Sequence, residues 1–216
     1  MQLLAVSDRI VDRLYSNEVA RQFPKVDLLI GCGDLPFFYL EFLVSSLNAT
    51  LVYVRGNHDR VPQYTSSGRT LLKPQGGIDL HATTHVVNGL LIAGLEGSMR
   101  YKPNASLMYT ETEMTLAVAR LIPSLLQRIA QYRRPLDILV THSPPYGIHD
   151  ENDLAHRGFR IFLTLLRLFR PRLLLHGHVH VYRGDVKRVS NYENTTIVNV
   201  YPYRLLNIVE DHLEVK

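Results

Sequence analysis

The chain has 216 residues, of which 46% are hydrophobic and 20% are charged, ordinary values for a globular protein of one substantial domain. Its net charge of +4 is not concentrated in one basic run, which argues against a dedicated nucleic-acid-binding protein but suits a phosphorylated substrate. A single cysteine excludes an intrachain disulfide and no apolar run reaches the roughly 18 residues of a membrane span, so we expect one cytoplasmic domain over residues 1–216.

Short apolar runs recur along the chain, and runs of this kind are typical of strands buried on both faces of an α/β sheet. They lie at residues 3–6, 26–30, 51–54, 90–93, 138–140, 173–175, 197–200 and 205–209. Between the third and fourth runs, residues 60–74 predict an irregular loop. The alternation of these runs with helical patterns predicts an α/β fold.

Three segments between these runs predict helices. The first covers residues 36–47 and begins at a proline, which suits the first helical position. The second is long and begins at Thr110, where Thr110 and Glu113 form a capping-box pattern. Pro123 lies inside it and is expected to kink or split it, because proline lacks the N–H that a helical turn requires. The third covers residues 157–169 and ends before a proline.

Polar residues of metal-ligand type follow five of the predicted strands. These residues, in chain order, are Asp8, Asp34, Asn57, His142 and His178. The carboxyl ends of parallel strands lie along one edge of a sheet, where binding sites form. We therefore expect residues that are far apart in the sequence to converge at that edge.

This set of side chains suits a pair of divalent metal ions. A carboxylate can bridge two ions, while an amide oxygen and neutral imidazole nitrogens complete their coordination. Such a pair activates water and neutralises charge on a phosphoryl group, and a nearby histidine can protonate the leaving oxygen. Glycines beside the ligands allow sharp turns where a side chain would crowd the metals.

The order of these motifs resembles the signature of the calcineurin-like metallophosphoesterase family. The matching residues, from 8 to 180, are Asp8, Gly33-Asp34, Gly56-Asn57-His58-Asp59, His142 and Gly177-His178-Val179-His180. The resemblance implies two mixed β-sheets packed face to face and flanked by helices. It also implies an enzyme that hydrolyses a phosphomonoester or phosphodiester of a small phosphorylated substrate by a metal-activated water. One or two divalent transition-metal ions are expected, Mn²⁺ first, with Fe, Zn, Ni, Co or Mg as alternatives.

The same resemblance implies a role for each matching residue. Asp34 bridges the two metals, and Asp8 and His180 belong to the first. The ligands of the second metal, besides the bridge, are Asn57, His142 and His178. His58 is implied as a general acid and transition-state stabiliser rather than a ligand, and Asp59 either orients His58 or stabilises its loop.

One position departs from the family pattern. The family places a histidine ligand of the first metal two residues after the first aspartate, and Ile10 stands there. Isoleucine cannot coordinate a metal, so we expect weaker affinity at the first position, an altered metal preference or a single bound ion. A replacement ligand from another loop is the alternative, and the candidates are Asp12, His149 and His156.

Three residues outside the motifs are candidates for binding the substrate. Arg100 follows a predicted strand, and its planar guanidinium can bind phosphate oxygens with two hydrogen bonds. His149 and His156 follow the His142 loop, and loops beyond strand ends form binding pockets. A surface position is an equally good interpretation of each.

Two other functions are compatible with the pattern. The family includes members with eroded metal sites, similar to the retromer component of this fold, and Ile10 favours a protein-binding scaffold of that kind. Erosion would not be expected to spare His58 or a full second-metal set, which favours the enzyme. A nuclease would require a basic track, and the short basic clusters available for one are Arg133-Arg134 and Arg167, Arg170 and Arg172.

Overall fold

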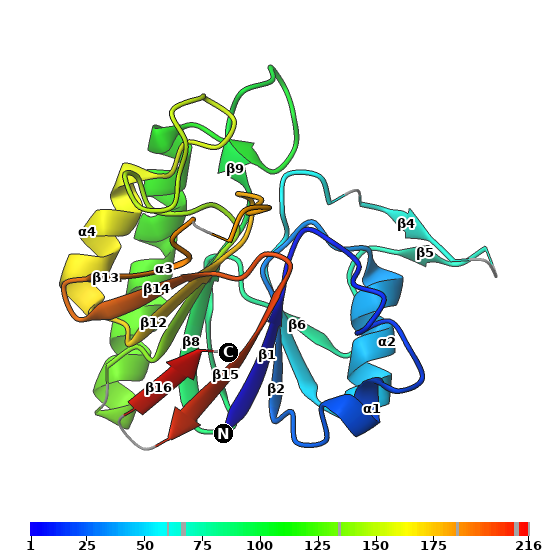
Figure 1. The fold of residues 1–216 in the computed structure, drawn as a ribbon. Helices are drawn as coiled ribbons and strands as arrows, with labels where there is room; N and C mark the ends of the chain where they lie inside the picture. Colours follow the sequence, from blue (N-terminus) through cyan, green and yellow to red (C-terminus); the bar gives the residue numbers. More distant parts are fainter. Residues whose placement is uncertain (60, 66–67, 134, 185, 210–211, 216) are drawn as a thin grey trace.

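Two six-stranded β-sheets lie face to face in a computed structural model of the chain, with helices on the outer face of each sheet (Figure 1). The structure describes residues 1–59, 61–65, 68–133, 135–184, 186–209 and 212–215. Arg60 and Arg134, which fell within sequence predictions, lie outside the described residues. Within the described part of the chain, no helix combines the length and the apolar character needed to cross a membrane.

The first sheet has the strand order β16-β15-β1-β2-β3-β6. Strands β1, β2, β3 and β6 run parallel, and β15 and β16 add antiparallel pairs at one side. The strands are β1 (Gln2–Val6), β2 (Leu28–Gly31), β3 (Thr50–Tyr53), β6 (Gly77–Asp79), β15 (Tyr203–Val209) and β16 (His212–Val215). Two helices accompany this sheet, α1 (Val19–Gln22) and α2 (Phe37–Leu47).

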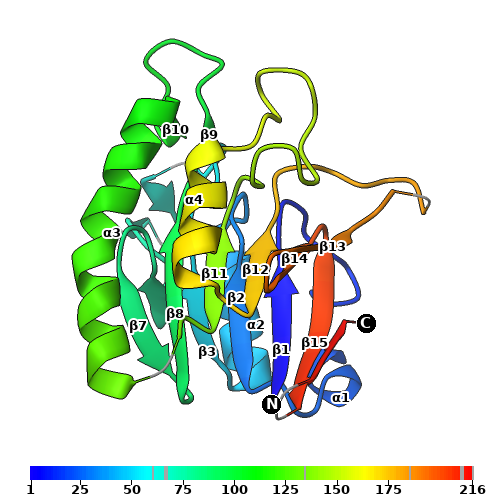
Figure 2. The same cartoon turned by 90° about the vertical axis from the view of Figure 1, so that its left-hand side faces the viewer.

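The second sheet has the strand order β13-β14-β12-β11-β8-β7 and is also mixed. Its strands are β7 (Thr84–Val87), β8 (Leu90–Leu95), β11 (Ile138–Thr141), β12 (Leu173–His176), β13 (Val189–Tyr192) and β14 (Thr195–Asn199). Figure 2 shows the helices α3 (Glu111–Tyr132) and α4 (Arg160–Phe169) covering its outer face. Two small sheets lie in the loops, β4 (Gln63–Tyr64) with β5 (Thr70–Leu71) and β9 (Ser98–Met99) with β10 (Met108–Tyr109).

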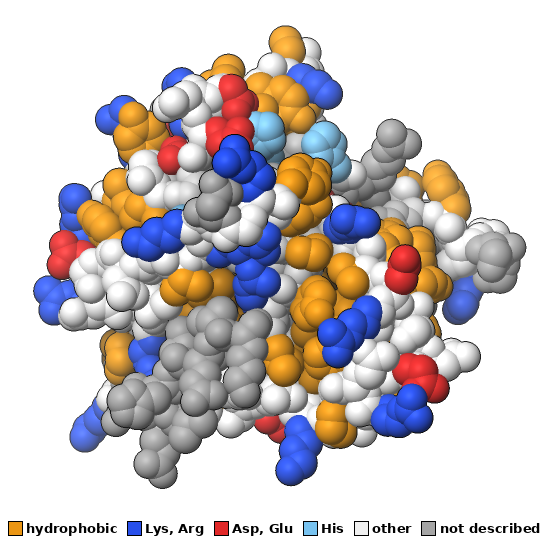
Figure 3. Space-filling view, in the orientation of Figure 1, with side chains coloured by type: hydrophobic (Ala, Val, Ile, Leu, Met, Phe, Trp, Pro, Cys, Tyr) orange, Lys and Arg blue, Asp and Glu red, His pale blue; other side chains and the backbone are white. Residues whose placement is uncertain are grey.

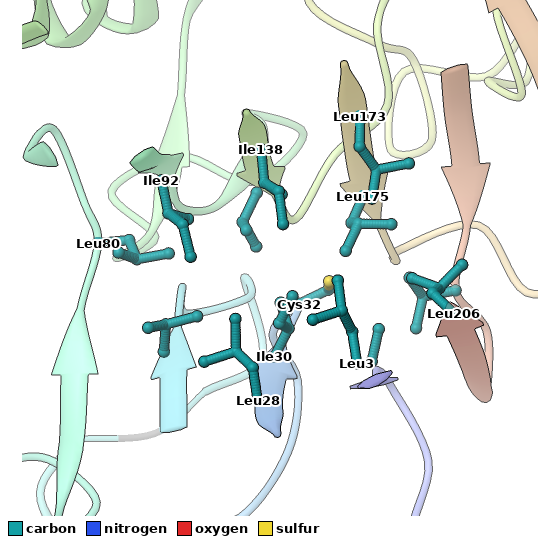
Figure 4. Close-up of a cluster of buried hydrophobic side chains, with 14 of the residues drawn as sticks. Leu3, Leu28, Ile30, Cys32, Leu80, Ile92, Ile138, Leu173, Leu175 and Leu206 are labelled. Carbon is teal, nitrogen blue, oxygen red and sulfur yellow. The ribbon is translucent and has the colours of Figure 1, made fainter. Parts of the chain in front are cut away.

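Apolar side chains from both sheets fill the space between them. Alternate residues of β1 point to opposite faces, so Leu3 faces the opposing sheet while Leu4 packs in the cluster beneath α2. Figure 4 shows Leu3 and Ile30 of the first sheet pointing toward Ile138 and Leu175 of the second. Shortening one such side chain to alanine is expected to cost about 2–5 kcal/mol. This layer fixes how the two sheets sit against each other.

The long helix α3 begins as the sequence predicted. The Thr110 hydroxyl accepts a hydrogen bond from the Glu113 N–H at 3.2 Å, and the Glu113 carboxylate accepts one from the Thr110 N–H at 2.7 Å. The sequence predicts that Pro123 kinks or splits this helix; the split is wrong, because α3 continues through Pro123. Pro123 is exposed, and the opposite face of the helix packs on the second sheet from Met114 to Ile129. That packing holds both halves of the helix together across the missing hydrogen bond.

The starts of two helices and one predicted loop differ from the sequence prediction for local reasons. Pro36 adopts an extended conformation and caps α2 rather than occupying its first turn. The third helix begins at Arg160 rather than at residue 157, because Phe159 is extended and pairs with Pro145 in an isolated bridge. The loop predicted over residues 60–74 contains the β4–β5 hairpin within its described part, so the prediction of irregular structure is wrong there.

The strands that carry the polar residues all end at the same side of the molecule. β1, β2 and β3 are parallel within the first sheet, as are β8, β11 and β12 within the second. The loops that follow them gather along the upper edge in Figure 1, above the layer between the sheets. The fold therefore brings both sheets' ligand-bearing loops to one edge.

Candidate metal centre

The loops after β1, β2 and β12 meet around one cavity of about 290 Å³. It is called the metal cavity below, after the candidate metal ligands around it. The residues that line it are Asp8, Asp34, His58, His156, His178 and His180. His142, after β11, lies buried beneath this cavity with Asn57, which follows β3. Histidine side chains reach the surface in the upper part of Figure 3, above the layer between the two sheets.

Backbone carbonyls fix the proton positions on two of the histidines. Nδ1 of His142 lies 2.8 Å from the Cys32 carbonyl oxygen, and Nε2 of His178 lies 2.7 Å from the Ala155 carbonyl oxygen. A ring nitrogen that faces a carbonyl oxygen must carry the proton. In the neutral rings, Nε2 of His142 and Nδ1 of His178 therefore both present lone pairs, and they lie 3.1 Å apart.

Two oxygens complete this arrangement of acceptors. Asn57 Oδ1 lies 3.0 Å and Asp34 Oδ2 lies 3.4 Å from His142 Nε2. Asn57 directs its nitrogen to the Tyr101 hydroxyl at 3.4 Å, which leaves its oxygen for the centre. Contacts of this length match the ligand-to-ligand spacing around an ion bound at about 2.1 Å. Ligand atoms of Asp34, His142 and His178 lie within 4.8 Å of one another with the Asn57 oxygen beside His142, so a cation fits this donor set.

In the absence of a cation, a proton on His142 satisfies part of this set of acceptors. Burial opposes a charge on His142, but Asp34 raises the pKa of His142 to about 9. Burial and then the charge of His142 lower the pKa of His178 to about 4. Burial would raise the pKa of Asp34, but His142 and the His58 N–H, which donates at 2.7 Å, lower it to about 2. Asp34 is therefore ionised at neutral pH.

A second group of donors surrounds Asp8. Its Oδ2 accepts hydrogen bonds from the His178 N–H at 2.9 Å and from the Ser7 hydroxyl. Its Oδ1 is buried without a hydrogen-bond partner among the described residues and faces Nε2 of His180 at 3.5 Å. An unpartnered buried carboxylate oxygen is costly, and a cation between Asp8 and His180 would satisfy it. Asp8 also raises the pKa of His180.

His180 is held from its other side by aromatic residues. Its Nδ1 lies 3.0 Å from the Tyr182 hydroxyl, and its ring stacks on Tyr201 with centroids 4.5 Å apart. Ile10, the departure from the family pattern, is half-buried against the apolar cluster beneath the first sheet. Asp8, Asp34 and His180 line the same cavity and are the residues of the matching motifs that could hold an ion at this position.

Three of these residues adopt the left-handed backbone conformation, with φ of 62° at Asp8, 56° at Asp34 and 66° at His178. This conformation costs roughly 1–2 kcal/mol for a residue with a side chain. Gly33, beside Asp34, has φ of 94°, and a Cβ there would lie 2.6 Å from His142 Nδ1. The tight packing of the loops around the ligands therefore requires glycine at position 33.

His58 is exposed and lies at the border between the metal cavity and a neighbouring one. Asp59 contacts the backbone: its Oδ2 accepts from the Gly56 N–H at 2.7 Å and from the Asp34 N–H at 3.0 Å. These bonds tie the loop after β3 to the loop after β2. Burial, and then the charge of Asp34, raise the pKa of Asp59 to about 7.

The structure does not bring Arg100 to the metal cavity. Arg100 donates to the Met108 carbonyl at 3.0 and 3.2 Å and to the Glu113 carboxylate at 2.9 Å. It lines a separate cavity of about 200 Å³ together with His81 and Tyr109. Asp12 is exposed, and it is not among the residues that line the metal cavity.

His149 belongs to a hydrogen-bonded chain that ends at Gly177, the residue before His178. Nδ1 of His176 lies 3.0 Å from the Gly177 carbonyl oxygen and so carries the proton. Nε2 of His176 accepts from Nδ1 of His149 at 3.0 Å, and Nε2 of His149 accepts from the Ser190 hydroxyl at 2.9 Å. No sequence pattern marks this chain, because its members lie on β12, β13 and the loop after β11.

His156 is the one candidate outside the matching motifs that lines the metal cavity. Its Nδ1 lies 2.9 Å from Asp153 Oδ2, and its ring centroid lies 5.3 Å from that of His178. Asp153 also accepts from the backbone N–H groups of Ala155 and His156. The carboxylate therefore fixes both the loop and the proton on Nδ1, which leaves Nε2 as an acceptor in the neutral ring.

Comparisons with known proteins agree with this architecture. A sequence model of the family described as "Calcineurin-like phosphoesterase" matches residues 4–182. No curated protein sequence matches the chain.

Solved structures confirm the predicted two-sheet fold. The protein TT1561 of Thermus thermophilus is 18% identical with a TM-score of 0.62, covering 100% of this chain and 97% of that one. The phosphopantetheinyl hydrolase PptH from Mycobacterium tuberculosis is 14% identical with a TM-score of 0.53, covering 92% and 88%. GAP50 of Plasmodium is 12% identical with a TM-score of 0.55, covering 100% and 83%.

Proposed function

The chain belongs to the calcineurin-like phosphoesterase family, and we propose that it is a metal-dependent hydrolase of phosphomonoesters or phosphodiesters. The observation that carries this proposal is the convergence of lone pairs from Asp34, Asn57, His142 and His178, whose closest contacts are 3.0 to 3.4 Å. In the apo protein only a proton on His142 partly satisfies this buried set of acceptors, which is unfavourable. It becomes favourable when a cation is bound.

The residues divide into two candidate metal positions that share Asp34. Asn57, His142 and His178 would complete one, and Asp8 and His180 the other. A divalent ion bound there supplies Lewis-acid stabilisation of phosphoryl charge and lowers the pKa of a coordinated water. The first position has one imidazole fewer than the family pattern because of Ile10, so we propose that it binds its ion more weakly.

The chain's own residues supply the remaining chemistry. His58 borders the metal cavity, is exposed to solvent and is anchored through its backbone by Asp34. In hydrolysis the oxygen of water bonds to phosphorus, the ester P–O bond breaks, and the departing oxygen takes a proton. We assign that proton to the His58 ring, which regains one as the attacking water loses its own. Asp59 holds the His58 loop against the loop after β2.

The comparisons alone do not choose between enzyme and scaffold, since one similar fold belongs to a protein named as a hydrolase and another to one described as an anchor. A specific observation favours a scaffold as the second candidate. Exposed Tyr15 packs edge to face against exposed Phe38 of α2, with ring centroids 5.9 Å apart. Against it stand His58 and the complete four-donor set, which a scaffold does not need.

A small phosphorylated molecule is a better substrate class than a nucleic acid. Arg167, Arg170 and Arg172 lie at the end of α4 and the start of β12. The metal centre lies at the other end of β12, after its carboxyl terminus. A nucleic-acid backbone bound by these arginines would therefore lie at the end of β12 that is opposite the candidate metal centre.

An assay of metal-stripped protein tests the proposal. Mn²⁺, Zn²⁺, Mg²⁺, Ni²⁺, Co²⁺ and Fe²⁺ would each be added with 4-nitrophenyl phosphate or bis(4-nitrophenyl) phosphate. We expect saturable, metal-dependent turnover that is lost in Asp34→Asn and kept in Asp27→Asn, an exposed carboxylate at the opposite edge. Metal binding without turnover of either ester would favour the scaffold, and absence of metal binding would overturn the proposal.

A further inference from the structure

Two cavities meet at the candidate active site. The metal cavity of about 290 Å³ and a neighbouring cavity of about 480 Å³ are lined in common by Asp34 and His58. Asp8, His178 and His180 line the first cavity alone. The second cavity therefore opens on the side of His58 that faces away from those ligands.

The position of His58 assigns a part of the substrate to each cavity. A general acid must lie within hydrogen-bond reach of the oxygen that it protonates. The phosphoryl group must lie over the metal ligands, so the breaking P–O bond lies at the border where His58 stands. The leaving group then extends into the second cavity.

The walls of the second cavity are mainly apolar. Leu35 and Pro36 come from the turn between β2 and α2, and Pro62 and Tyr64 come from the β4 hairpin and the residue before it. The side chain of Tyr64 is 74% exposed. An exposed aromatic ring beside a cavity offers a flat surface on which a ring of the ligand can stack.

The apolar walls of this cavity offer no described partner for a charge on the leaving group. Among the described lining residues, Asp34 and Asp59 are the acidic ones, and no lysine or arginine is present. A charged group placed against Leu35, Pro36 and Pro62 would lose water without a charged partner on those walls, which costs free energy. An uncharged group avoids this cost.

Gln63 adds one polar contact that suits an uncharged ligand. Its side-chain oxygen accepts a hydrogen bond from the Phe37 N–H at 2.9 Å, at the start of α2. This bond orients the carboxamide and leaves its nitrogen as the donor. Gln63 lines the cavity, so that nitrogen can donate to a carbonyl oxygen or ring nitrogen of a neutral ligand.

We infer that the substrate is a phosphoester whose leaving group is an uncharged aromatic alcohol, bound in the second cavity against Leu35 and Tyr64. This inference rests on the proposed function. It divides the site into a metal side that holds the phosphoryl group and an apolar side that selects the alcohol.

The test compares two esters that share a phosphoryl group and differ by one carboxylate on a 4-nitrophenyl leaving group. We expect kcat/KM to be about tenfold higher for the uncharged ester, because the carboxylate of the other ester loses water against the apolar walls. Tyr64→Ala should raise KM for the uncharged ester about five- to tenfold with little change in kcat, because a stacking contact is lost. Tyr64→Phe keeps the ring and should leave KM unchanged.

Tyr132→Ala is the matched control, since Tyr132 is an exposed tyrosine at the end of α3 that lines neither cavity. Equal or better turnover of the carboxylated ester, or an unchanged KM in Tyr64→Ala, would overturn the inference. If neither ester is hydrolysed, the proposed function fails instead. Saturation-transfer NMR with 4-nitrophenol then tests the cavity itself: a signal lost only in Tyr64→Ala supports it, and an equal or absent signal in all proteins overturns it.

Discussion

Nε2 of His142 lies 3.1 Å from Nδ1 of His178, and the other nitrogen of each ring donates a hydrogen bond to a backbone carbonyl, that of Cys32 or Ala155. Neutral rings in this arrangement have no hydrogen between them. The pair is stable only when a proton or a metal ion occupies the space, and the two compete for the same lone pairs.

Metal binding should release a proton. Asp34 raises the pKa of His142 to about 9 despite burial, so the ring is protonated at pH 7 in the metal-free protein and must lose that proton to bind an ion. Metal affinity should therefore increase with pH up to about 9. Calorimetry in two buffers of different ionisation enthalpy measures the release, which we expect to be about one proton. Equal heats in both buffers would contradict the prediction.

The two metal positions should differ in affinity. A titration with Mn²⁺ or Zn²⁺ is expected to show a tight step at Asp34, Asn57, His142 and His178 and a weaker step involving Asp8. Asn57→Ala should weaken the tight step by at least about tenfold, whereas Asp8→Asn should affect the weak step. Calorimetry and metal analysis after dialysis give the stoichiometry. Two equal steps in the wild-type protein would show that Ile10 does not weaken the first position.

His58→Ala should lower kcat without loss of metal. Removal of a general acid typically costs about 10²–10⁴ in rate, and the loss should be smaller for a good leaving group such as 4-nitrophenol. Metal affinity should stay unchanged because the His58 side chain is not a ligand in this assignment. His85→Ala, a histidine on β7, is the matched control. Equal rate losses for good and poor leaving groups would rule out His58 as the general acid.

Acid should destabilise the protein through His149. Burial, and then Lys187, lower the pKa of His149 from 6.5 to about 4, while Asp150 acts in the opposite direction. Because the unfolded state binds a proton more readily, the stability from the neutral ring is complete above pH 6.5 and is lost as pH falls toward 4. Burial and then His149 also lower the pKa of His176, to about 3.

Urea denaturation of metal-free protein at pH 7.5, 6 and 5 measures this effect as a fall in the free energy of unfolding. His149→Gln should start less stable, because it disrupts the bonds to His176 and Ser190. It should also lose less unfolding free energy between pH 7.5 and 5 than the wild-type protein. Parallel curves for the two proteins would show that His149 does not titrate in this window.

Gly33→Ala should destabilise the metal centre. Gly33 has φ of 94° and a Cβ there would lie 2.6 Å from His142 Nδ1, so both the backbone and the ligand must shift. Gly89→Ala is the matched control, with φ of 79° and no atom within 4 Å of the added Cβ. The control is expected to cost about 1–2 kcal/mol of unfolding free energy. Gly33→Ala should cost more and also weaken metal binding, and equal effects would contradict the crowding argument.

The sequence determined the central strands, because their apolar runs are buried on both faces and leave few alternatives. Edge strands such as β6 and β13 escaped prediction, since their side chains are partly exposed and carry no such pattern. Local polar signals succeeded where the structure uses them directly, as at Thr110. The proline at position 123 does not split α3, because packing against the second sheet outweighs the lost hydrogen bond.

The sequence also determined which residues arrive at the carboxyl edge, because strand order and the residue after each strand are sequence properties. Only the tertiary structure decided how they meet there. The carbonyls of Cys32 and Ala155 orient His142 and His178, and every residue has a carbonyl, so no side-chain pattern marks them. Long-range packing likewise paired Arg100 with Glu113 rather than with the metal cavity, because contacts between distant segments depend on distances that one-dimensional spacing does not contain.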